Sequence, residues 1–303
     1  MKYICLFITI FTAGSLVHGA VFTNSVSVDS FVRASAPTSN YGGAGADAIS
    51  GASATNVLGA ANGAFDTFIR FNTFSMVTNF NVLFGSNNWV INGATLQVTE
   101  QSAPNNNIFN RGKGAFEVRW IANDSWTEGT GSPLTPGTTG VVYTNETTLL
   151  NAGTDVSLGT YTNLQTDTQQ SFSLALANDF ISDMQAGGEV GLFMTSADPN
   201  IGFTFSSRSF TPASGRPFLI VSAVPRPRIA SATVSGADLN LSCTNGASGG
   251  TYVLLMNSDA TAPLNHWTPV ATNTLAAAGA FSITASNVVG ASSAQQFFTV
   301  QTK

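Results

Sequence analysis

The sequence predicts an all-β protein made of two sandwich domains, a larger jelly-roll-like one followed by a smaller one. Short segments of alternating apolar and polar residues recur along the chain, and a period of two is typical of strands with one buried face. Glycine, asparagine, proline and serine separate these segments, and only 9% of the residues are charged, against about 25% in ordinary soluble domains. This composition excludes a coiled coil. The net charge of −5 without a basic run excludes electrostatic binding of nucleic acid.

Residues 1–20 predict a secretory signal peptide. Lys2 supplies a short basic start, Tyr3 to Phe11 form an apolar core, and the small residues Gly19 and Ala20 offer a cleavage site. The alternative is a membrane anchor, but the apolar stretch is well short of the roughly 20 residues that a spanning helix needs. We therefore expect a bacterial protein that is secreted or held at the cell surface, without a membrane span.

Export would leave the chain with very few reactive side chains. Cys5 and His18 would be removed with the signal peptide, so Cys243 and His266 would remain. A single cysteine cannot form an internal disulfide, and Cys243 alternates with leucines as a buried strand residue does. A single histidine rules out a His-rich metal site and leaves only His266 for a Ser-His-Asp triad. These absences favour a non-enzymatic protein.

A proline-rich segment divides the mature chain into two domains. Residues 224–228 read Val-Pro-Arg-Pro-Arg, and alternating prolines favour an extended linker over a helix or a central strand. We place the linker at 225–228, the first domain at 21–224 and the second at 229–303. Both domains have plausible sizes for independent folding.

The pattern of the first domain predicts a series of short strands. In 115–122, Phe116, Val118 and Trp120 point one way, and Glu117 and Arg119 point the other. The other predicted strands are 25–33, 67–72, 94–100, 139–144, 171–176, 189–195, 203–208 and 217–223. Strands of this length with polar loops indicate a two-sheet, jelly-roll-like sandwich.

One helix and two long loops interrupt these strands. The helix is expected over 178–186, capped by Asn178 and ended by Gly187. The loops cover 34–64 and 129–138, and long loops inside compact domains are usually functional or mobile.

The second domain is predicted to be a small immunoglobulin- or fibronectin-like β-sandwich. Its predicted strands are 239–243, 251–257, 281–285 and 296–302. They are short, alternate apolar with polar residues, and are separated by turn residues, as in that class of sandwich.

Seven segments in order resemble the DNRLRE-type domain, which is grouped with carbohydrate-binding module family 96. They are DSFVR at 29–33, NYG at 40–42, FIRF at 68–71, ATLQV at 94–98, VRWIANDSWTE at 118–128, FTFSSR at 203–208 and PFLIV at 217–221. The resemblance spans about 25–223 and implies a β-sandwich that binds polysaccharide without cleaving it. Ser209 stands where the family usually has glutamate, so an ion pair made by that glutamate would be missing here.

The C-terminal segment resembles a module that recurs in large exported bacterial proteins. The similar parts are GGTYVLLMN at 249–257, PLNHWTPVATN at 263–273 and QQFFTVQ at 295–301. The resemblance implies a β-sandwich appendage without known chemistry.

Four arginines are candidate ligand-binding residues in a chain that is poor in charge. Guanidinium groups can hold sugar hydroxyls or uronate carboxylates through paired hydrogen bonds. The four are Arg33, Arg70, Arg119 and Arg208. Internal pairing is the favoured alternative, because arginines in folded proteins are commonly exposed or paired. The candidate partners are Asp29, Asp66, Glu100 and Glu117.

Two aromatic residues are candidate platforms for sugar rings, which present flat faces of C–H groups. Trp126 follows a polar turn and Tyr41 lies in a glycine-rich loop. Packing in the core is an equally good interpretation of both. Trp120 alternates with core residues and is expected to be buried.

Carboxylates offer a weaker signal. No motif requires a cofactor. A structural calcium ion, with Asp29 and Asp124 as its candidate ligands, remains an open alternative, because such ions often fix the loops of sandwich modules. A glycosidase needs two acids about 5–10 Å apart. Acids that could supply the pair are Glu100, Glu117, Asp124 and Glu128, none of them in a recognised catalytic motif.

The sequence thus predicts a secreted, non-catalytic protein that binds polysaccharide or a cell-surface glycan. The alternative is a structural component of the cell surface or extracellular matrix that associates with itself as a homo-oligomer, which low charge and exposed strand edges favour. A polysaccharide-cleaving enzyme ranks a distant third.

Overall fold

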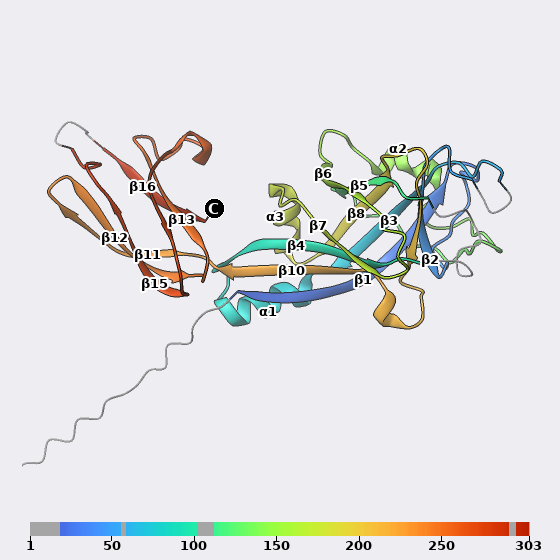
Figure 1. Cartoon of the computed structure of the whole chain (residues 1–303), viewed down its shortest axis with the longest axis horizontal. Coiled ribbons are helices and arrows are strands. Elements are labelled where there is room, and N and C mark those ends of the chain that lie inside the picture. The colour runs from blue at the N-terminus through green and yellow to red at the C-terminus, as the bar shows by residue number, and fades with distance from the viewer. Residues whose placement is uncertain (1–18, 56–58, 102–111, 291–294, 303) are drawn as a thin grey trace, which may run out of the picture. The chain divides into compact units, whose positions relative to one another are not determined.

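The computed structural model describes residues 19–55, 59–101, 112–290 and 295–302. Strands dominate these residues, so the all-β prediction is confirmed (Figure 1). The chain divides into two compact units, one from Ala20 to Ala223 and one that starts at Val224.

The first unit is a sandwich of two layers of antiparallel strands, and one long strand takes part in both layers. β1 (Ala20–Arg33) pairs through residues 20–25 with β10 and through residues 26–33 with β3, and its register shifts between Val26 and Val28. The strand order is β6-β5-β8-β3-β1-β10-β4-β7, with β2 paired to β3 and β9. Since β1 belongs to both halves, it joins the two layers of the sandwich.

The bounds of the other strands follow the sequence pattern closely. They are β2 (Ala46–Ser50), β3 (Phe65–Asn72), β4 (Trp89–Thr99), β5 (Ala115–Ile121), β6 (Val156–Thr162), β7 (Gln169–Ser173), β8 (Glu189–Ser196), β9 (Gly202–Ser206) and β10 (Phe218–Pro225). β2 and β6 were not predicted. β2 lies inside the segment 34–64 that the sequence assigns to a loop, and it forms by pairing with β9.

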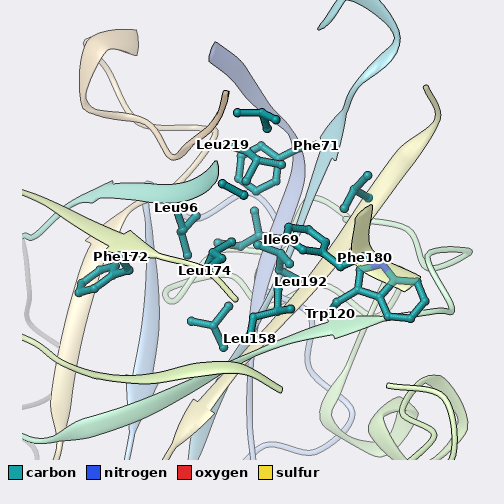
Figure 2. Close-up of a cluster of buried hydrophobic side chains, with 14 of the residues drawn as sticks. Ile69, Phe71, Leu96, Trp120, Leu158, Phe172, Leu174, Phe180, Leu192 and Leu219 are labelled. Atoms are coloured by element: carbon teal, nitrogen blue, oxygen red, sulfur yellow. The ribbon is translucent and has the colours of Figure 1, made fainter. Parts of the chain in front are cut away.

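The main core lies between the two layers, where apolar side chains from opposite sheets meet (Figure 2). Trp120 is 8% exposed and its indole N–H donates to Asp183 Oδ2 at 2.8 Å, so the expectation that it is a core residue is confirmed. Buried aromatic and aliphatic side chains of this kind each contribute roughly 1.5–3 kcal/mol to folding.

Two helices, which contact each other, pack against this core. α1 (Phe74–Phe84), which the sequence did not reveal, buries Met76 and Phe80 one turn apart. α3 (Asn178–Ala186) has the predicted bounds and ends at Gly187, whose φ of +76° favours glycine. Its cap is Ala177 rather than Asn178, so the expected side-chain cap is wrong: Asn178 is already the first helical residue.

The predicted strand at 139–144 is also wrong. Residues Tyr143–Asn145 form a 3-10 turn that leads into α2 (Glu146–Leu149). The Asn145 side-chain oxygen accepts a hydrogen bond from the Val142 backbone N–H at 2.9 Å, which stabilises a turn instead of a strand ladder.

The second unit is a separate sandwich of two three-stranded antiparallel sheets. One sheet has the order β11 (Arg228–Ser235), β12 (Asp238–Gly246), β15 (Gly279–Ala285), and the other β14 (Thr268–Thr274), β13 (Thr251–Asn257), β16 (Phe297–Thr302). Its core includes Tyr252, Leu254, Phe281 and Cys243. Cys243 is a buried free thiol, as its strand position predicted, and burial raises its pKa.

Candidate functional site

A long segment, residues 122–150, covers the face of the β1-β3-β8-β5 sheet that points away from the main core. Cross-strand neighbours on that face include Phe68 and Phe193. The covering segment contributes apolar side chains that bury these residues and form a second cluster. Its members are Val32, Phe68, Ile121, Trp126, Val141, Leu149 and Phe193. We call the segment 122–150 the cover segment.

Trp126 lies inside this cluster and is 5% exposed. Its ring centroid is 5.6 Å from that of Phe68, and the Arg70 guanidinium lies over its ring at 5.0 Å. The expectation of an open aromatic platform is therefore wrong for this residue, because the cover segment folds back and buries the indole. Tyr41 is likewise 3% exposed and stacks on Phe31 with ring centroids 4.5 Å apart, so it offers no platform either.

Arg70 fastens the cover segment to the sheet. Its Nη1 donates to the backbone oxygens of Asp124 and Trp126, the latter at 3.0 Å. Its Nε lies 3.4 Å from Glu189 Oε2. The Arg70 guanidinium thus pairs with groups of the protein itself, as the internal-pairing alternative expects. Its partners, however, are not among the four acids that the sequence indicated.

Arg208 forms a two-pronged ion pair with Glu128 of the cover segment. Nε donates to Glu128 Oε1 at 2.7 Å, and Nη2 contacts Oε2. Glu128 belongs to the Trp-Thr-Glu stretch of the resemblance, so the pair forms without residue 209. The Ser209 side chain is exposed.

The remaining two arginines are Arg33 and Arg119, and both are partly exposed. Arg33 Nε donates to Ser35 Oγ at 2.9 Å, and its guanidinium lies 5.1 Å from the centroid of Phe65. The Arg119 side chain is 31% exposed and lies 3.9 Å from Glu117, one of the expected partners. Arg119 Nη2 also contacts the Asp155 backbone oxygen at 3.5 Å. Both Arg70 and Arg119 thus contact backbone oxygens of pocket-lining residues, although neither side chain lines a pocket itself.

A first group of carboxylates is buried where the cover segment begins. Asp29 and Asp47 are each 1% exposed, and Asp29 Oδ2 accepts the Arg208 backbone N–H at 2.5 Å. Burial raises the pKa of Asp29 to about 7 and that of Asp47 well above its usual range. The neighbouring Glu128 carboxylate raises both pKa values further, and Asp29 also raises that of Asp47, whereas the hydrogen bond from Asp47 lowers the pKa of Asp29. Two such carboxyls side by side are stable when they share a proton.

This arrangement does not support the expected calcium site. The structure places Asp29 in the buried group and Asp124 on the wall of a surface pocket, so it does not bring the two together. Among the described residues, no group of three or more His, Cys, Asp or Glu side chains is placed to hold a metal ion.

A second pair of carboxyls lies where the cover segment ends. Asp66 of β3 is 5% exposed and hydrogen-bonds to Glu146 of α2 and to Thr195. Burial, followed by the neighbouring Asp66 carboxylate, raises the pKa of Glu146 to about 8. Buried carboxyls with raised pKa values therefore lie beside the cover segment near both Glu128 and Glu146.

The thermal unfolding midpoint should consequently fall as the pH rises from 5 to 9. The pKa values of Asp29, Asp47, Asp66 and Glu146 are all raised in the folded protein above the roughly 4 of an unfolded chain. Their stabilising contribution is complete below the unfolded pKa and is lost as the pH rises through the folded pKa values, which are about 7 for Asp29 and about 8 for Glu146. Calorimetry on the wild type and on Glu146→Gln measures this. Glu146→Gln, with its neutral amide, should make the unfolding midpoint less dependent on pH. A wild-type midpoint that rises toward pH 8 would contradict the raised pKa values of these carboxyls.

Two shallow, adjacent pockets open on the outer surface of the cover segment. Their volumes are about 230 and 410 Å³, and both include Thr148 and Leu149. The smaller is also lined by Ser125, Trp126, Thr127, Gly140, Val141 and Asn145, and the larger by Ala122, Asn123, Asp124, Asn151, Thr154 and Asp155. Hydroxyl and amide side chains dominate the polar lining.

Local hydrogen bonds fix the walls of the larger pocket. Asp155 is 8% exposed, and its carboxylate accepts from the backbone N–H groups of Ala122 at 3.1 Å and Asn151 at 2.7 Å. Asn123 Oδ1 accepts from the Ser125 hydroxyl at 2.6 Å. The turns that carry the lining are therefore held in place before any ligand arrives.

Sequence reasoning found only two of these lining residues, Asp124 and Trp126. It missed Thr148, Asn151, Thr154 and Asp155. The available signal was a second polar turn, Asn-Ala-Gly-Thr-Asp at 151–155, which resembles the Asn-Asp-Ser turn at 123–125 in composition. Only the fold shows that the two turns lie beside one pocket.

Comparison with known proteins adds little to this geometry. No protein-family model and no curated protein sequence matches the chain. Solved structures that match include β-D-glucuronidase of Dictyoglomus thermophilum, with 9% identity, a TM-score of 0.26, and coverage of 88% of this chain and 38% of that one. The β-glucuronidase of Ruminococcus gnavus has 8% identity and a TM-score of 0.23, with coverage of 94% and 41%. The chain thus spans about two fifths of the length of the two glucuronidases.

A tandem of two family 22 carbohydrate-binding modules from Paenibacillus barcinonensis also matches, with 10% identity and a TM-score of 0.23 over 96% of this chain and 91% of that one. TM-scores this low carry no argument about function. In the part of the chain that the structure describes, no helix has the length and apolar character needed to cross a bilayer.

Proposed function

We propose that this chain is an exported, non-catalytic protein whose larger unit binds a polysaccharide or cell-surface glycan at the two pockets of the cover segment. The observation that carries the proposal is the lining of these pockets by hydroxyl and amide side chains around Leu149. The ordered resemblance to the DNRLRE-type domain and the predicted signal peptide support it.

The chemistry of the pockets suits sugars. Hydroxyl, amide and carboxylate groups exchange hydrogen bonds with sugar hydroxyls, and Leu149 offers an apolar contact for C–H groups. Because Arg70, Glu128 and Asp155 hold the cover segment in place, little ordering is left to oppose binding. Residues 21–224 carry 14 acids and 7 bases, a net charge of 7 − 14 = −7, which favours a neutral glycan over a strongly anionic one.

The placement of the acids supports binding over cleavage. A glycosidase needs two carboxyls about 5–10 Å apart on either side of the scissile bond. The pairs Asp29–Asp47 and Asp66–Glu146 instead hydrogen-bond within each pair and are covered. Asp124 and Asp155 both line the larger pocket, but the Asp155 carboxylate already accepts hydrogen bonds from the backbone N–H groups of Ala122 and Asn151.

Filling the shared wall of the pockets tests the proposal. Thr148→Tyr places a bulky ring in both pockets, and we expect glycan affinity to fall at least about tenfold, equivalent to about 1.4 kcal/mol. Thr147→Tyr is the matched control, because Thr147 is the exposed neighbour on α2 and lines neither pocket. A glycan array followed by affinity electrophoresis measures both variants.

Two results would contradict the proposal. One is that the folded wild type binds no neutral or anionic glycan on the array. The other is release of reducing ends or unsaturated products from a polysaccharide incubated with the purified protein, which would indicate an enzyme.

A further inference from the structure

The second unit has one closed side and one open side. Its sheets have the orders β11-β12-β15 and β14-β13-β16, and β14 lies against β15. Asn273 of β14 donates through Nδ2 to the Ser282 backbone oxygen of β15 at 2.8 Å, and Pro269 interrupts β14. Both features protect that side. The opposite side is formed by β11 and β16.

β16 is an unprotected edge. Within the described residues it pairs only with β13, over six consecutive residue pairs without a register shift. Its sequence, Phe-Phe-Thr-Val-Gln-Thr, contains no charge and no proline. Natural proteins usually protect exposed edges with charges, prolines or bulges, because unpaired backbone groups pair readily with another strand. A regular, uncharged edge is what a strand-to-strand interface requires.

Among the described residues, the apolar space beside this edge is also incompletely covered. Every residue of β11 is exposed. Val234 is 58% exposed although it pairs with buried Leu239, and Ile229 is 42% exposed although it pairs with buried Cys243. Directly opposed residues point to the same side of a sheet, so both side chains face inward without a cover. From the other sheet, Phe298 and Val300 reach the core and are only partly buried.

We propose that the second unit binds a second copy of this chain, with β16 of one copy pairing antiparallel with β16 of the other across a two-fold axis. This axis, normal to the sheets, also brings β11 of one copy to β11 of the other. Each open strand gains a partner and the inward apolar side chains are covered. β16 carries no charge, and the one charge of β11, Arg228, stands at its first residue. Antiparallel pairing along the whole strand places this residue at the opposite end from its counterpart in the partner copy, so identical edges meet without like-charge repulsion.

The side-chain pattern restricts the register of this pairing. Phe298 and Val300 face the core, whereas Thr299 and Gln301 alternate with them and face outward. Residues directly opposite each other must lie on the same side. The two residue numbers of each pair therefore sum to an even number. The two such registers that pair the most residues of β16 place Thr299 opposite either Thr299 or Gln301 of the partner copy.

Paired charges on the edge test the proposal in either register. In the double variant Thr299→Lys with Gln301→Lys, a lysine lies opposite a lysine of the partner copy in both registers. In the double variant Thr299→Glu with Gln301→Glu, a glutamate lies opposite a glutamate in the same way. Sizing chromatography with light scattering should show a dimer for the wild type and a monomer for each double variant, with dimer affinity at least about tenfold weaker. An equimolar mixture of the lysine and glutamate variants should restore the dimer.

The control places the same charges on the closed side. Ala280→Lys with Ser282→Lys adds two lysines at exposed, outward positions of β15 and should leave the dimer intact. Circular dichroism and thermal unfolding verify that each variant folds, and recovery in the mixture excludes a folding defect. A wild type that stays monomeric at its highest soluble concentration, or a lysine variant that stays dimeric, would overturn the proposal. Neither outcome depends on glycan binding.

Discussion

Replacing Trp126 by alanine should lower the free energy of unfolding of the first unit by about 3–5 kcal/mol, the range measured for large aromatic residues in cores. The side chain is 5% exposed and packs between Phe68 and Arg70, so its removal leaves a cavity under the cover segment. Denaturant unfolding followed by tryptophan fluorescence and circular dichroism measures the change. Trp126→Phe should lose considerably less, because an aromatic ring still fills most of the space.

This experiment also separates the two interpretations of Trp126. A residue that acts as an exposed sugar platform would lose glycan affinity while the unfolding midpoint stayed constant. We expect the opposite order of effects: a large loss of stability, with loss of binding only as a consequence. An alanine variant as stable as the wild type would show that the indole is not part of the second cluster.

Arg208→Leu should cost about 3 kcal/mol of stability, the lower end of what the loss of one partner of a buried ion pair costs. The Arg208 side chain is 39% exposed, which moderates the effect, but Glu128 is 11% exposed and would keep its charge without a partner. Asp29, buried beside it, would lose a favourable positive neighbour. Chemical unfolding at pH 7 measures the difference.

The double variant Arg208→Leu with Glu128→Leu provides the control. Removing both charges relieves the unpaired carboxylate, so the double variant should recover part of the stability lost by the single one. If the two substitutions destabilise additively, the ion pair contributes nothing beyond packing and the fastening role assigned to it is wrong.

Much of the fold followed from the two-residue period, and the parts that did not have physical reasons. β5 was predicted to within one residue because Phe116, Val118 and Trp120 alternate along it and all face the main core. β2 was missed because its sequence, Ala-Asp-Ala-Ile-Ser, has little strand propensity and pairs through tertiary contact with β9. α1 was missed because apolar residues lie on several of its faces, with Phe74, Val82 and Leu83 exposed, which obscures the helical pattern.

The candidate site was less predictable than the fold. A tryptophan after a polar turn has the same local pattern whether the next residues fold away from it or over it, and the fate of Trp126 is decided by the cover segment. Residues 139–144 alternate like a strand, yet Asn145 converts them to a turn that leads into α2. The arginines illustrate the same limit: internal pairing was expected, but only Arg119 has a partner, Glu117, that the sequence had indicated.

Hydrogen–deuterium exchange with and without a glycan selected on the array tests whether the glycan binds at the cover segment, because it locates the binding surface without any substitution. If sugar binds on the surface of the cover segment, the added protection should concentrate in residues 122–155. Protection confined to 34–50 or to residues beyond 228, or binding without any protection in 122–155, would show that the glycan does not bind at the cover segment.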